Sequence, residues 1–194
     1  MTAVAETKPT LTVLAGPTAV GKGTVSQYIR EHYPNVWFSV SATTRDPRPG
    51  EVEGVHYYYV SDEEFDSMVE NRQMLEWALV HNSYRYGTMR SRVEKALEQG
   101  KHVLLEIDLQ GARQIRNNMP EAQLIFLAPP SWDELVNRLV GRGTESAQEQ
   151  EMRLDTAKIE LAAEPEFDVT VINDDVARAA EEIIEIMGVK SSSK

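Results

Sequence analysis

Near the N-terminus, a short glycine-rich segment has the residue types and spacing of a phosphate-binding loop. Gly16-Pro17-Thr18-Ala19-Val20-Gly21-Lys22 follows the apolar run LTVLA and opens a helical pattern. Glycines allow backbone N–H groups to close around phosphate oxygens, a helix N-terminus adds partial positive charge, and a lysine neutralises the β- and γ-phosphates. The segment therefore predicts the binding of a nucleoside triphosphate.

The residue after Lys22 departs from the usual pattern of such loops. A serine or threonine hydroxyl commonly reaches Mg²⁺ from that position, whereas this chain has Gly23 there and Thr24 one position later. Two arrangements remain open. Either Mg²⁺ is held mainly by nucleotide oxygens and water, which suits its reluctance to dehydrate, or Thr24 serves the α-phosphate side.

Two arginines three residues apart, Arg45 and Arg48, form a second candidate phosphate site. They lie in the segment TTRDPRPGE, where Pro47 and Pro49 prevent helix formation and stiffen the loop. A stiff loop loses less entropy when two guanidinium groups close on one phosphate. An arbitrary arginine pair is more often a solvated turn, but beside a phosphate loop the pair favours a phosphorylated ligand.

Two carboxylates, Glu106 and Asp108, end a predicted buried strand over residues 101–107. Their spacing of two residues directs both side chains to the same face of a strand. This is the usual position of acids near a nucleotide's metal ion. Both are candidates for organising the water around Mg²⁺, and Asp108 is also a candidate for contacting a base.

These residues must be positioned by short apolar strands that alternate with helical patterns, the signature of a parallel sheet with crossover helices. Strands are predicted over 11–15, 101–107, 123–128 and 169–172, and helices over 22–32, 109–117, 132–140 and 176–187. Ser131 is a suitable N-cap for the third of these helices. Continuously apolar strands indicate burial on both faces, so the predicted fold class is α/β.

Two segments interrupt the alternation. Residues 39–88 are rich in proline, tyrosine and acid, and predict strands over 56–60 and 75–80 around a helix over 61–71. We interpret them as a small mixed α/β insertion. Residues 141–150 are polar, contain glycine and lie between two helices, a composition typical of a mobile lid. The core is then expected over 10–38 and 89–187, with flexible ends at 1–9 and 188–194.

The composition excludes several classes of protein. With 194 residues, of which 41% are apolar, the chain can form one sizeable domain with a core. Its net charge of −11 weighs against nucleic acid or an anionic membrane as partner. The absence of cysteine excludes thiol catalysis and disulfides and fits a reducing, cytoplasmic location. No apolar run reaches the length of a membrane-spanning helix.

Several longer motifs occur in the order found in guanylate kinases, and the chain resembles that family from about Leu11 to Met187. The motifs are GPTAVGKGT, SVSATTRDPRPGEVEGVHYYYV, LEWALV followed by SYRYGT, LLEIDLQGA, RLVGRGTES and VINDD. The resemblance implies a P-loop NTP-hydrolase-type core that binds ATP, a GMP-binding insertion and a lid. It also implies phosphorylation of GMP and dGMP by ATP with Mg²⁺, in purine nucleotide salvage and GTP supply.

The resemblance assigns roles to individual residues. ATP would be bound by residues 16–24 together with Arg142 and Asn173. The GMP phosphate would be bound by Arg45, Arg48, Tyr57 and Tyr86. Guanine would be bound by Glu76, with Ser41, Thr88 and Asp108 around the rest of the base. Thr88 stands where some relatives have serine, which keeps the hydroxyl and adds a methyl group.

The chemistry of guanine supports the assignment of Glu76. Guanine presents N1–H and N2–H₂ side by side, and the two oxygens of an ionised carboxylate accept both hydrogen bonds. Adenine would direct a lone pair at the carboxylate, and a site with mismatched polar groups rejects such an analogue by on the order of 10⁴–10⁵. A lone glutamate in a strand is more often exposed; the surrounding motifs favour base recognition.

Three arginines and a lysine are the candidates for catalysis. Arg138 and Arg142 lie four residues apart and share a helix face, and Arg153 follows the segment GRGTES. The resemblance implies that they close, with Lys22, over the transferring γ-phosphoryl group. A phosphate is already a competent oxygen nucleophile, so no base is required, and one arginine is worth roughly 10³–10⁵ in rate in related sites. Ion pairs with nearby glutamates are the structural alternative.

Two other functions remain open. Some guanylate-kinase-like domains have lost turnover and bind phosphorylated peptides in the nucleotide-phosphate pocket. The complete loop with Lys22 and the lid arginines Arg142 and Arg153 weigh against that class, because a binding module does not need them. The other possibility is a related kinase with a different phosphorylated acceptor, against which the guanine-binding set weighs. Oligomeric state is not predicted.

The acidic charge is concentrated in two blocks. Residues 51–76 contain eight acidic residues and one basic residue, and residues 160–187 contain nine acidic residues and one basic residue. Because these blocks carry −7 and −8, the remainder of the chain carries +4. All the cations assigned to phosphate lie in that remainder, so we expect a positive cleft in an otherwise negative protein.

Overall fold

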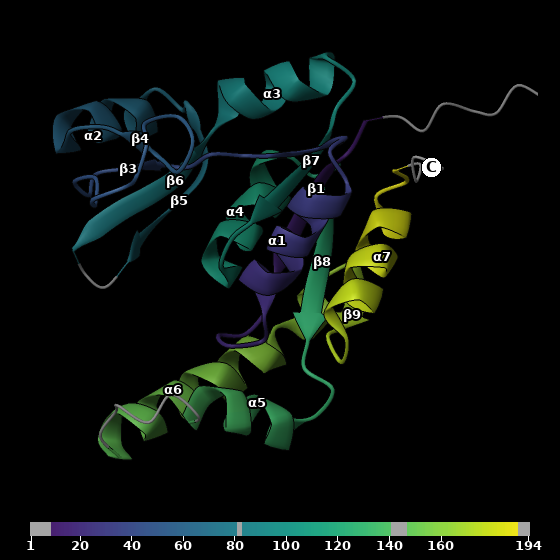
Figure 1. Cartoon of the computed structure of the whole chain (residues 1–194). Helices are drawn as coiled ribbons and strands as arrows, with labels where there is room; N and C mark the ends of the chain where they lie inside the picture. The colour runs from purple at the N-terminus through teal and green to yellow at the C-terminus, as the bar shows by residue number, and fades with distance from the viewer. Residues whose placement is uncertain (1–8, 81–82, 141–146, 190–194) are drawn as a thin grey trace, which may run out of the picture.

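A five-stranded parallel sheet forms the centre of the molecule in the computed structural model, which describes residues 9–80, 83–140 and 147–189 (Figure 1). Across the sheet, the strands are β2 (Val36–Phe38), β7 (His102–Glu106), β1 (Leu11–Ala15), β8 (Gln123–Ala128) and β9 (Val169–Ile172). Every residue of the central strand β1 is buried. The predicted α/β class with a parallel sheet is confirmed.

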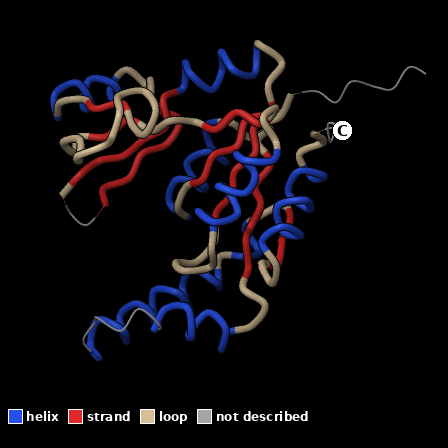
Figure 2. Tube along the Cα trace, viewed as in Figure 1, coloured by secondary structure: helices blue, strands red, loops and turns tan. Residues whose placement is uncertain are grey.

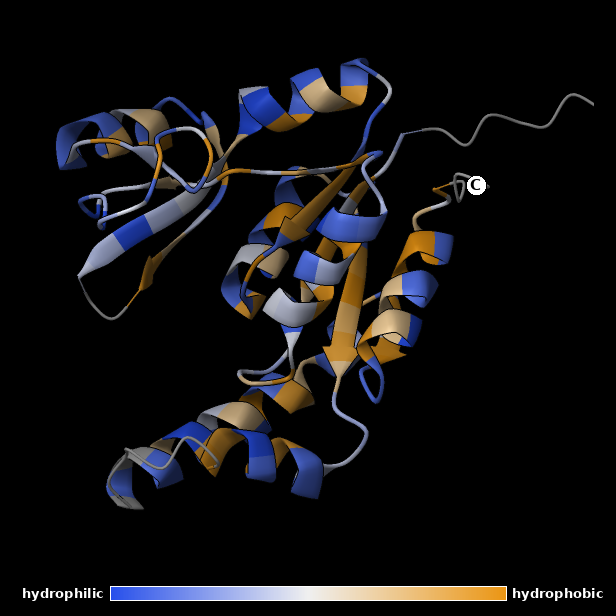
Figure 3. Ribbon diagram, in the orientation of Figure 1, coloured by the Kyte–Doolittle hydropathy of each residue, from blue (hydrophilic) through white to orange (hydrophobic). Residues whose placement is uncertain are grey.

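Helices cover both faces of this sheet. On one face, α1 (Lys22–His32) and α7 (Val176–Ile186) bury an apolar cluster that includes Leu14 and Leu104. On the other face, α3 (Arg90–Glu98) and α4 (Leu109–Asn118) bury a second cluster that includes Val13 and Leu105. Neighbouring residues of one strand thus enter different clusters, which is why strands such as β8 are hydrophobic along their length (Figure 3).

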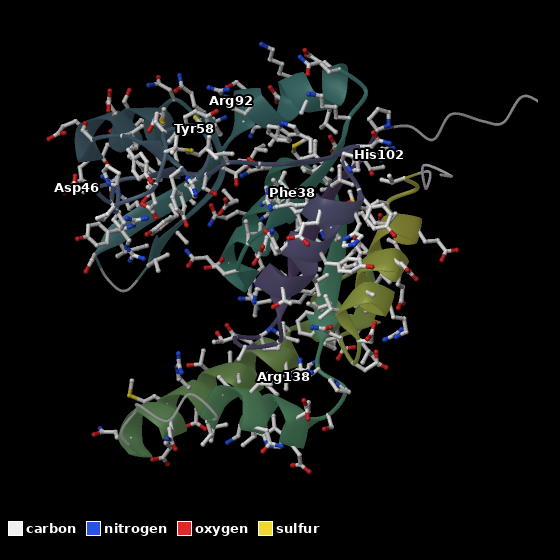
Figure 4. The ribbon with its side chains drawn as sticks, viewed as in Figure 1. Phe38, Asp46, Tyr58, Arg92, His102 and Arg138 are labelled. Carbon is white, nitrogen blue, oxygen red and sulfur yellow. The ribbon has the colours of Figure 1, made fainter. Side chains whose placement is uncertain are left out.

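A second, mixed sheet lies beside the core. Its order is β4 (Tyr58–Tyr59), β3 (Ala42–Thr43), β6 (Tyr84–Met89) and β5 (Met74–Val80), with β3 and β4 parallel and the other pairs antiparallel. Helix α2 (Asp62–Glu70) covers it, and its N-terminus is closed by the reciprocal capping bonds of Ser61 and Glu64. The guanidinium of Arg92 on α3 lies 4.4 Å from the ring centre of Tyr58, which joins this sheet to the core (Figure 4).

Two helices form a third part of the molecule. Helices α5 (Trp132–Val140) and α6 (Ala147–Ala162) pack together through Leu135, Leu139 and Ala157. A short 3₁₀ helix, η1 (Glu164–Glu166), then leads to β9. Figure 2 shows that the α5–α6 pair and the second sheet project from the same side of the core. The side chain of Ser131 accepts the Glu134 N–H at 3.1 Å, as predicted for an N-cap.

The predicted strands and helices of the core lie within one or two residues of the observed ones. In the second sheet, the strand predicted over 56–60 was too long, because residues 52–57 form turns in which Gly54 N–H bonds to Tyr57 O and His56 N–H to Val52 O. Helix α6 begins inside the segment 141–150, whose residues 141–146 lie outside the described part of the chain. Within the described residues, no helix has the length and apolar character needed to cross a membrane.

Candidate functional site

The predicted phosphate loop joins β1 to α1 at the end of the parallel sheet. Gly16 (φ 153°) lies against the backbone of β8, where a Cβ atom would collide with the Leu127 carbonyl oxygen. Gly21 has the left-handed φ of 100°, and a Cβ there would come within 2.6 Å of the Asn173 side-chain amide. Both positions therefore need glycine, and both bring the loop close to neighbouring elements.

Lys22 lies over the loop that precedes it. Its Nζ donates hydrogen bonds to the carbonyl oxygens of Gly16 at 2.7 Å and Pro17 at 3.1 Å. Burial lowers the pKa of Lys22, and the negative charges of Glu160, Glu106 and Asp108 oppose that shift. The ammonium group is therefore held at the loop, within the influence of three carboxylates.

A cavity of about 690 Å³ opens beside the loop. It is lined by Ala19, Gly21, Lys22, Gly23, Thr24, Glu106, Arg138, Asn173, Asp174 and Val176. Residues predicted for ATP, for the metal ion and for catalysis thus share one cavity. Its size falls in the range of small-molecule sites.

Two side chains from distant elements hold the loop carbonyl of Val20. Asn173, which follows β9, donates its Nδ2–H to that oxygen at 2.8 Å and is 4% exposed. Arg138 of α5 donates to the same oxygen at 3.1 Å and to the Asn173 carbonyl at 3.2 Å. Figure 4 places Arg138 where α5 meets the core. Both residues were predicted from the resemblance, and both brace the loop.

The remaining lid residues are not assembled at the cavity in the described part of the chain. Arg142 falls in the segment 141–146, outside the described residues. Arg153 lies on α6, is partly buried, and is absent from the lining of the cavity. Of the described residues predicted for catalysis, Lys22 and Arg138 therefore both line the cavity, whereas Arg153 of α6 does not.

The predicted acceptor-phosphate site is built around Arg45. This guanidinium donates from Nη2 to both oxygens of Glu51 at 2.8 and 2.9 Å, and from Nε to the Tyr86 hydroxyl at 3.2 Å. The rings of Tyr57 and Tyr86 meet edge to face at 5.6 Å. Three of the four predicted phosphate ligands are thus brought together, while the side chain of Arg48 is on the exposed side of the loop.

Sequence reasoning gave no role to Glu51 and Tyr59, which complete this cluster. Glu51 also accepts the backbone N–H of Arg48 at 2.7 Å and the Tyr59 hydroxyl at 2.8 Å. The hydrogen bonds from Arg45 lower the pKa of Glu51 to about 2. The only available signal was position, since Glu51 ends the same TTRDPRPGE segment and Tyr59 lies in HYYYV.

Two of the four residues predicted around the base, Glu76 and Thr88, pair on the neighbouring strands β5 and β6. Glu76 is 5% exposed, lies opposite Thr88, and accepts the Thr88 hydroxyl at 2.6 Å. Burial raises the pKa of Glu76 to about 7, against the lowering effect of the Thr88 hydrogen bond, and the charge of Asp108 raises it further. The carboxylate is thus buried and carries a proton more readily than an exposed glutamate.

A third residue predicted around the base lies at the N-terminus of helix α4. Asp108 is the N-cap of α4 and accepts the Gly111 N–H at 2.7 Å. A Cβ on Gly111 would lie 2.7 Å from Glu76 Oε2, so this glycine leaves room for the carboxylate. Sequence reasoning did not single out Gly111. Ser41 precedes β3 and is half-buried, and its carbonyl accepts the Tyr58 N–H at 2.9 Å.

The two parts of the predicted acceptor site share the strand β6. Tyr86 and Thr88 are two residues apart on β6, so their side chains leave the same face about 7 Å apart. Tyr86 belongs to the arginine cluster and Thr88 to the Glu76 pair. This arrangement suits a small ligand with a phosphate at one end and a planar polar group at the other.

The donor set fits a magnesium ion that is bound mainly by nucleotide and water. Thr24 and Glu106 line the same cavity, and oxygen is the ligand that Mg²⁺ prefers. The described residues contain no group of three or more histidine, aspartate or glutamate side chains placed to hold a metal ion.

Comparison with known proteins gives one consistent result. The family model for guanylate kinase matches residues 8–190. The guanylate kinase of Leifsonia xyli is 66% identical over 180 residues, which are 93% of this chain and 71% of that protein. The guanylate kinase of Streptomyces coelicolor is 59% identical over 184 residues, or 95% of this chain and 93% of that protein.

The fold agrees with a solved structure of the same kind. A crystal structure of guanylate kinase from Anaplasma phagocytophilum superposes with a TM-score of 0.72 at 32% identity, and the match covers 97% of this chain and 89% of that one. The resemblance inferred from the motifs is confirmed. This chain belongs to the guanylate kinase family.

Proposed function

We propose that this chain transfers the γ-phosphoryl group of ATP to GMP, and also to dGMP, at the cavity and strand pair described above. Membership of the family supports the reaction. The observation that carries the substrate assignment is the buried Glu76, which accepts a hydrogen bond from Thr88 and is influenced by the charge of Asp108. A phosphate loop alone does not identify the substrate, because such loops occur with many acceptors. The assigned contacts bind the base and the phosphate rather than the 2′-hydroxyl, which is why dGMP is included. We place the reaction in the cytoplasm.

The acceptor is bound at both of its ends. Arg45, Arg48, Tyr57 and Tyr86 bind the phosphate of GMP, and Arg45 exchanges part of its contact with Glu51 for that phosphate. At the other end, the ionised Glu76 accepts N1–H and N2–H₂ of guanine, with Ser41, Thr88 and Asp108 around the rest of the base. Fixing both ends orients the phosphate toward the donor.

The donor is bound by the phosphate loop. Within residues 16–24, backbone N–H groups other than those of Pro17, which has none, and Thr18, which donates to Glu160, surround the phosphates, and Lys22 neutralises the β- and γ-phosphates. Asn173 holds the loop through Val20 and lines the cavity, where it would contact ATP on the adenine side. Thr24 and Glu106, with Asp108 nearby, would hold water around Mg²⁺, which supplies charge neutralisation between the β- and γ-phosphates when bound.

The transfer is an in-line displacement at the γ-phosphorus of ATP. An oxygen of the GMP phosphate attacks the γ-phosphorus, the bond from that phosphorus to the β-γ bridging oxygen breaks, and ADP leaves with both electrons of that bond. The attacking oxygen carries no proton, so no general base is needed. Lys22, Arg138, Arg142 and Arg153 stabilise the charge on the moving group, which is the main source of rate in such reactions.

A coupled assay for ADP with four acceptors tests this function. GMP should be phosphorylated faster than AMP, UMP or dTMP by on the order of 10⁴–10⁵ in kcat/KM, because those bases leave polar groups of the site unpaired. Equal rates with the four acceptors would overturn the role of Glu76.

Two variants separate the donor and acceptor roles. Glu76→Gln should raise the KM for GMP and reduce the preference over AMP, because an amide cannot accept two hydrogen bonds side by side. Lys22→Ala should chiefly lower kcat while retaining GMP selectivity. Loss of selectivity in Lys22→Ala, or its retention in Glu76→Gln, would contradict the assignment.

A further inference from the structure

A direct contact joins the end of α6 to the phosphate loop. Oε2 of Glu160 accepts the backbone N–H of Thr18 at 2.7 Å, and Oε1 lies 3.5 Å from the Thr18 hydroxyl, which donates to it. The two residues are 142 positions apart in the chain. The bond from the N–H is short, as expected for a charged acceptor. The loop is therefore held from α6 as well as from Asn173 and Arg138.

The carboxylate of Glu160 also acts on the lysine of the loop. Among the charges that act on Lys22, Glu160 has the largest effect, ahead of Glu106 and Asp108. Glu160 itself is half-buried, so its carboxylate remains partly in contact with solvent. Its position is that of a side chain from the α5–α6 pair that contacts the ATP site.

The rotation of α6 about its axis is fixed by its packing on α5. Leu154, Ala157 and Leu161 enter the apolar cluster that contains Leu135 and Leu139 of α5. These three α6 residues are spaced by three and four positions, so they form one face of the helix. Because that face of α6 packs on α5, the direction of the adjacent face of α6 relative to α5 is also fixed.

Arg153 and Glu160 lie on that neighbouring face. They are seven residues apart, which is almost two full turns, so their side chains leave α6 in nearly the same direction about 10 Å apart along its axis. The contact of Glu160 with Thr18 thus fixes where the Arg153 face lies relative to the phosphate loop.

We propose that Glu160 is a positioning residue, which anchors α6 to the phosphate loop and so holds Arg153 in register with the transferring phosphoryl group. The proposal rests on the function proposed above for Arg153. The part that Glu160 plays is mechanical: its oxygen accepts the Thr18 N–H, and no bond of the substrates is made or broken at Glu160.

Three single variants test the proposal. Glu160→Ala removes the acceptor, and kcat should fall at least tenfold, toward the 10²-fold loss that a misplacement of about 1 Å causes. Glu160→Gln keeps an oxygen that accepts the Thr18 N–H, so it should retain most of the activity. Glu151→Ala removes an exposed carboxylate from the same helix and should behave as the unchanged chain. Thermal melting of each variant measures folding separately.

The KM values and a double variant distinguish positioning from other roles. The KM for GMP should stay unchanged in Glu160→Ala, because the contacts described for the acceptor site come from the second sheet and its loops and from the N-terminus of α4. If Glu160 acts through Arg153, adding Glu160→Ala to Arg153→Ala should cause little further loss. A full additional loss, a Glu160→Gln as impaired as Glu160→Ala, or a Glu160→Ala equal to Glu151→Ala would each overturn the proposal. An unimpaired Arg153→Ala would instead overturn the role proposed for Arg153.

Discussion

Two glutamates of the acceptor site have carboxyl groups with opposite properties. Glu51 accepts hydrogen bonds from Arg45, the Arg48 backbone and Tyr59, and these hold its pKa at about 2. Glu76 accepts one from Thr88 and is buried, which raises its pKa to about 7. Glu51 is thus ionised at any physiological pH and keeps Arg45 in place, whereas Glu76 titrates near neutrality.

The raised pKa of Glu76 predicts a pH dependence of GMP use. Only the ionised carboxylate accepts two hydrogen bonds from guanine, so kcat/KM for GMP should fall about tenfold for each pH unit below 7. The measurement is kcat/KM for GMP between pH 5.5 and 8.5 at saturating ATP.

The matching control is Glu76→Gln, which has no ionisable group at this position. The phosphate of GMP also gains a proton near pH 6, and that contribution appears equally in both proteins. The ratio of the two profiles should therefore show one titration near pH 7. Parallel profiles would exclude Glu76 as the titrating group.

At the scale of elements, the strand–loop–helix unit of β1 and α1 depends on the neighbouring strand β8. Gly16 approaches the Leu127 carbonyl so closely that a side chain would collide with it, whereas a Cβ on Gly23 would lie 3.6 Å from Glu106 Oε1. The first is a hard backbone contact and the second an ordinary van der Waals contact. The loop is thus confined on the side of β8 and open on the side of the cavity.

This asymmetry predicts different effects of two alanine substitutions. Gly16→Ala should lower the free energy of unfolding by about 2–4 kcal/mol, through overpacking and an unfavourable φ, and raise the KM for ATP. Gly23→Ala lies in the first turn of α1, where alanine favours helix, and should be neutral or slightly stabilising. Urea unfolding of both variants measures the difference. Equal stabilities would show that the loop can move away from β8.

The elements that sequence reasoning predicted are those whose own residues specify them. Strands β1 and β8 are unbroken apolar runs, and α5 has a serine N-cap. Strand β3 was not predicted from the sequence, because it has only two residues and is defined by its partners β4 and β6. Helix α3 was missed because it is mostly charged and buries only Val93 and Ala96.

The same distinction applies to the site. The phosphate loop could be predicted because its residues are contiguous and their spacing is specific. The contact of Glu160 with Thr18 spans 142 positions, and the fit of Gly111 against Glu76 joins different elements. Such contacts depend on how α4 and α6 pack, which a single sequence does not specify.

At the scale of the whole molecule, the site lowers the stability of the fold. Ionised Glu76 is buried, and burial of a charge is unfavourable unless a ligand compensates for it. The folded chain holds a proton on Glu76 up to about pH 7, whereas the unfolded chain releases it near 4.5. Raising the pH through that interval therefore lowers the free energy of unfolding, by about 3 kcal/mol once complete.

The stability of Glu76→Gln relative to the unchanged chain should then depend on pH. The glutamine variant lacks this titration, so it should gain about 3 kcal/mol relative to the unchanged chain between pH 4.5 and pH 8. Urea unfolding of both proteins across this range measures the gain. A constant difference would mean that the carboxyl is not destabilised by burial. If the glutamine variant gains this stability, the buried carboxylate of the unchanged chain lowers the stability of the fold for the sake of function, as is common at binding sites.

The order of strands in the core sheet has a consequence for the making of the protein. The central strand β1 is synthesised long before both of its neighbours, β7 and β8, which come later in the chain. Roughly 90 residues separate β1 from β7, which takes roughly 5–20 s at the usual speed of translation. During that time the backbone N–H and C=O groups of β1 have no strand to pair with and its apolar side chains are not yet covered, so we expect the nascent chain to be prone to association until β7 has been synthesised.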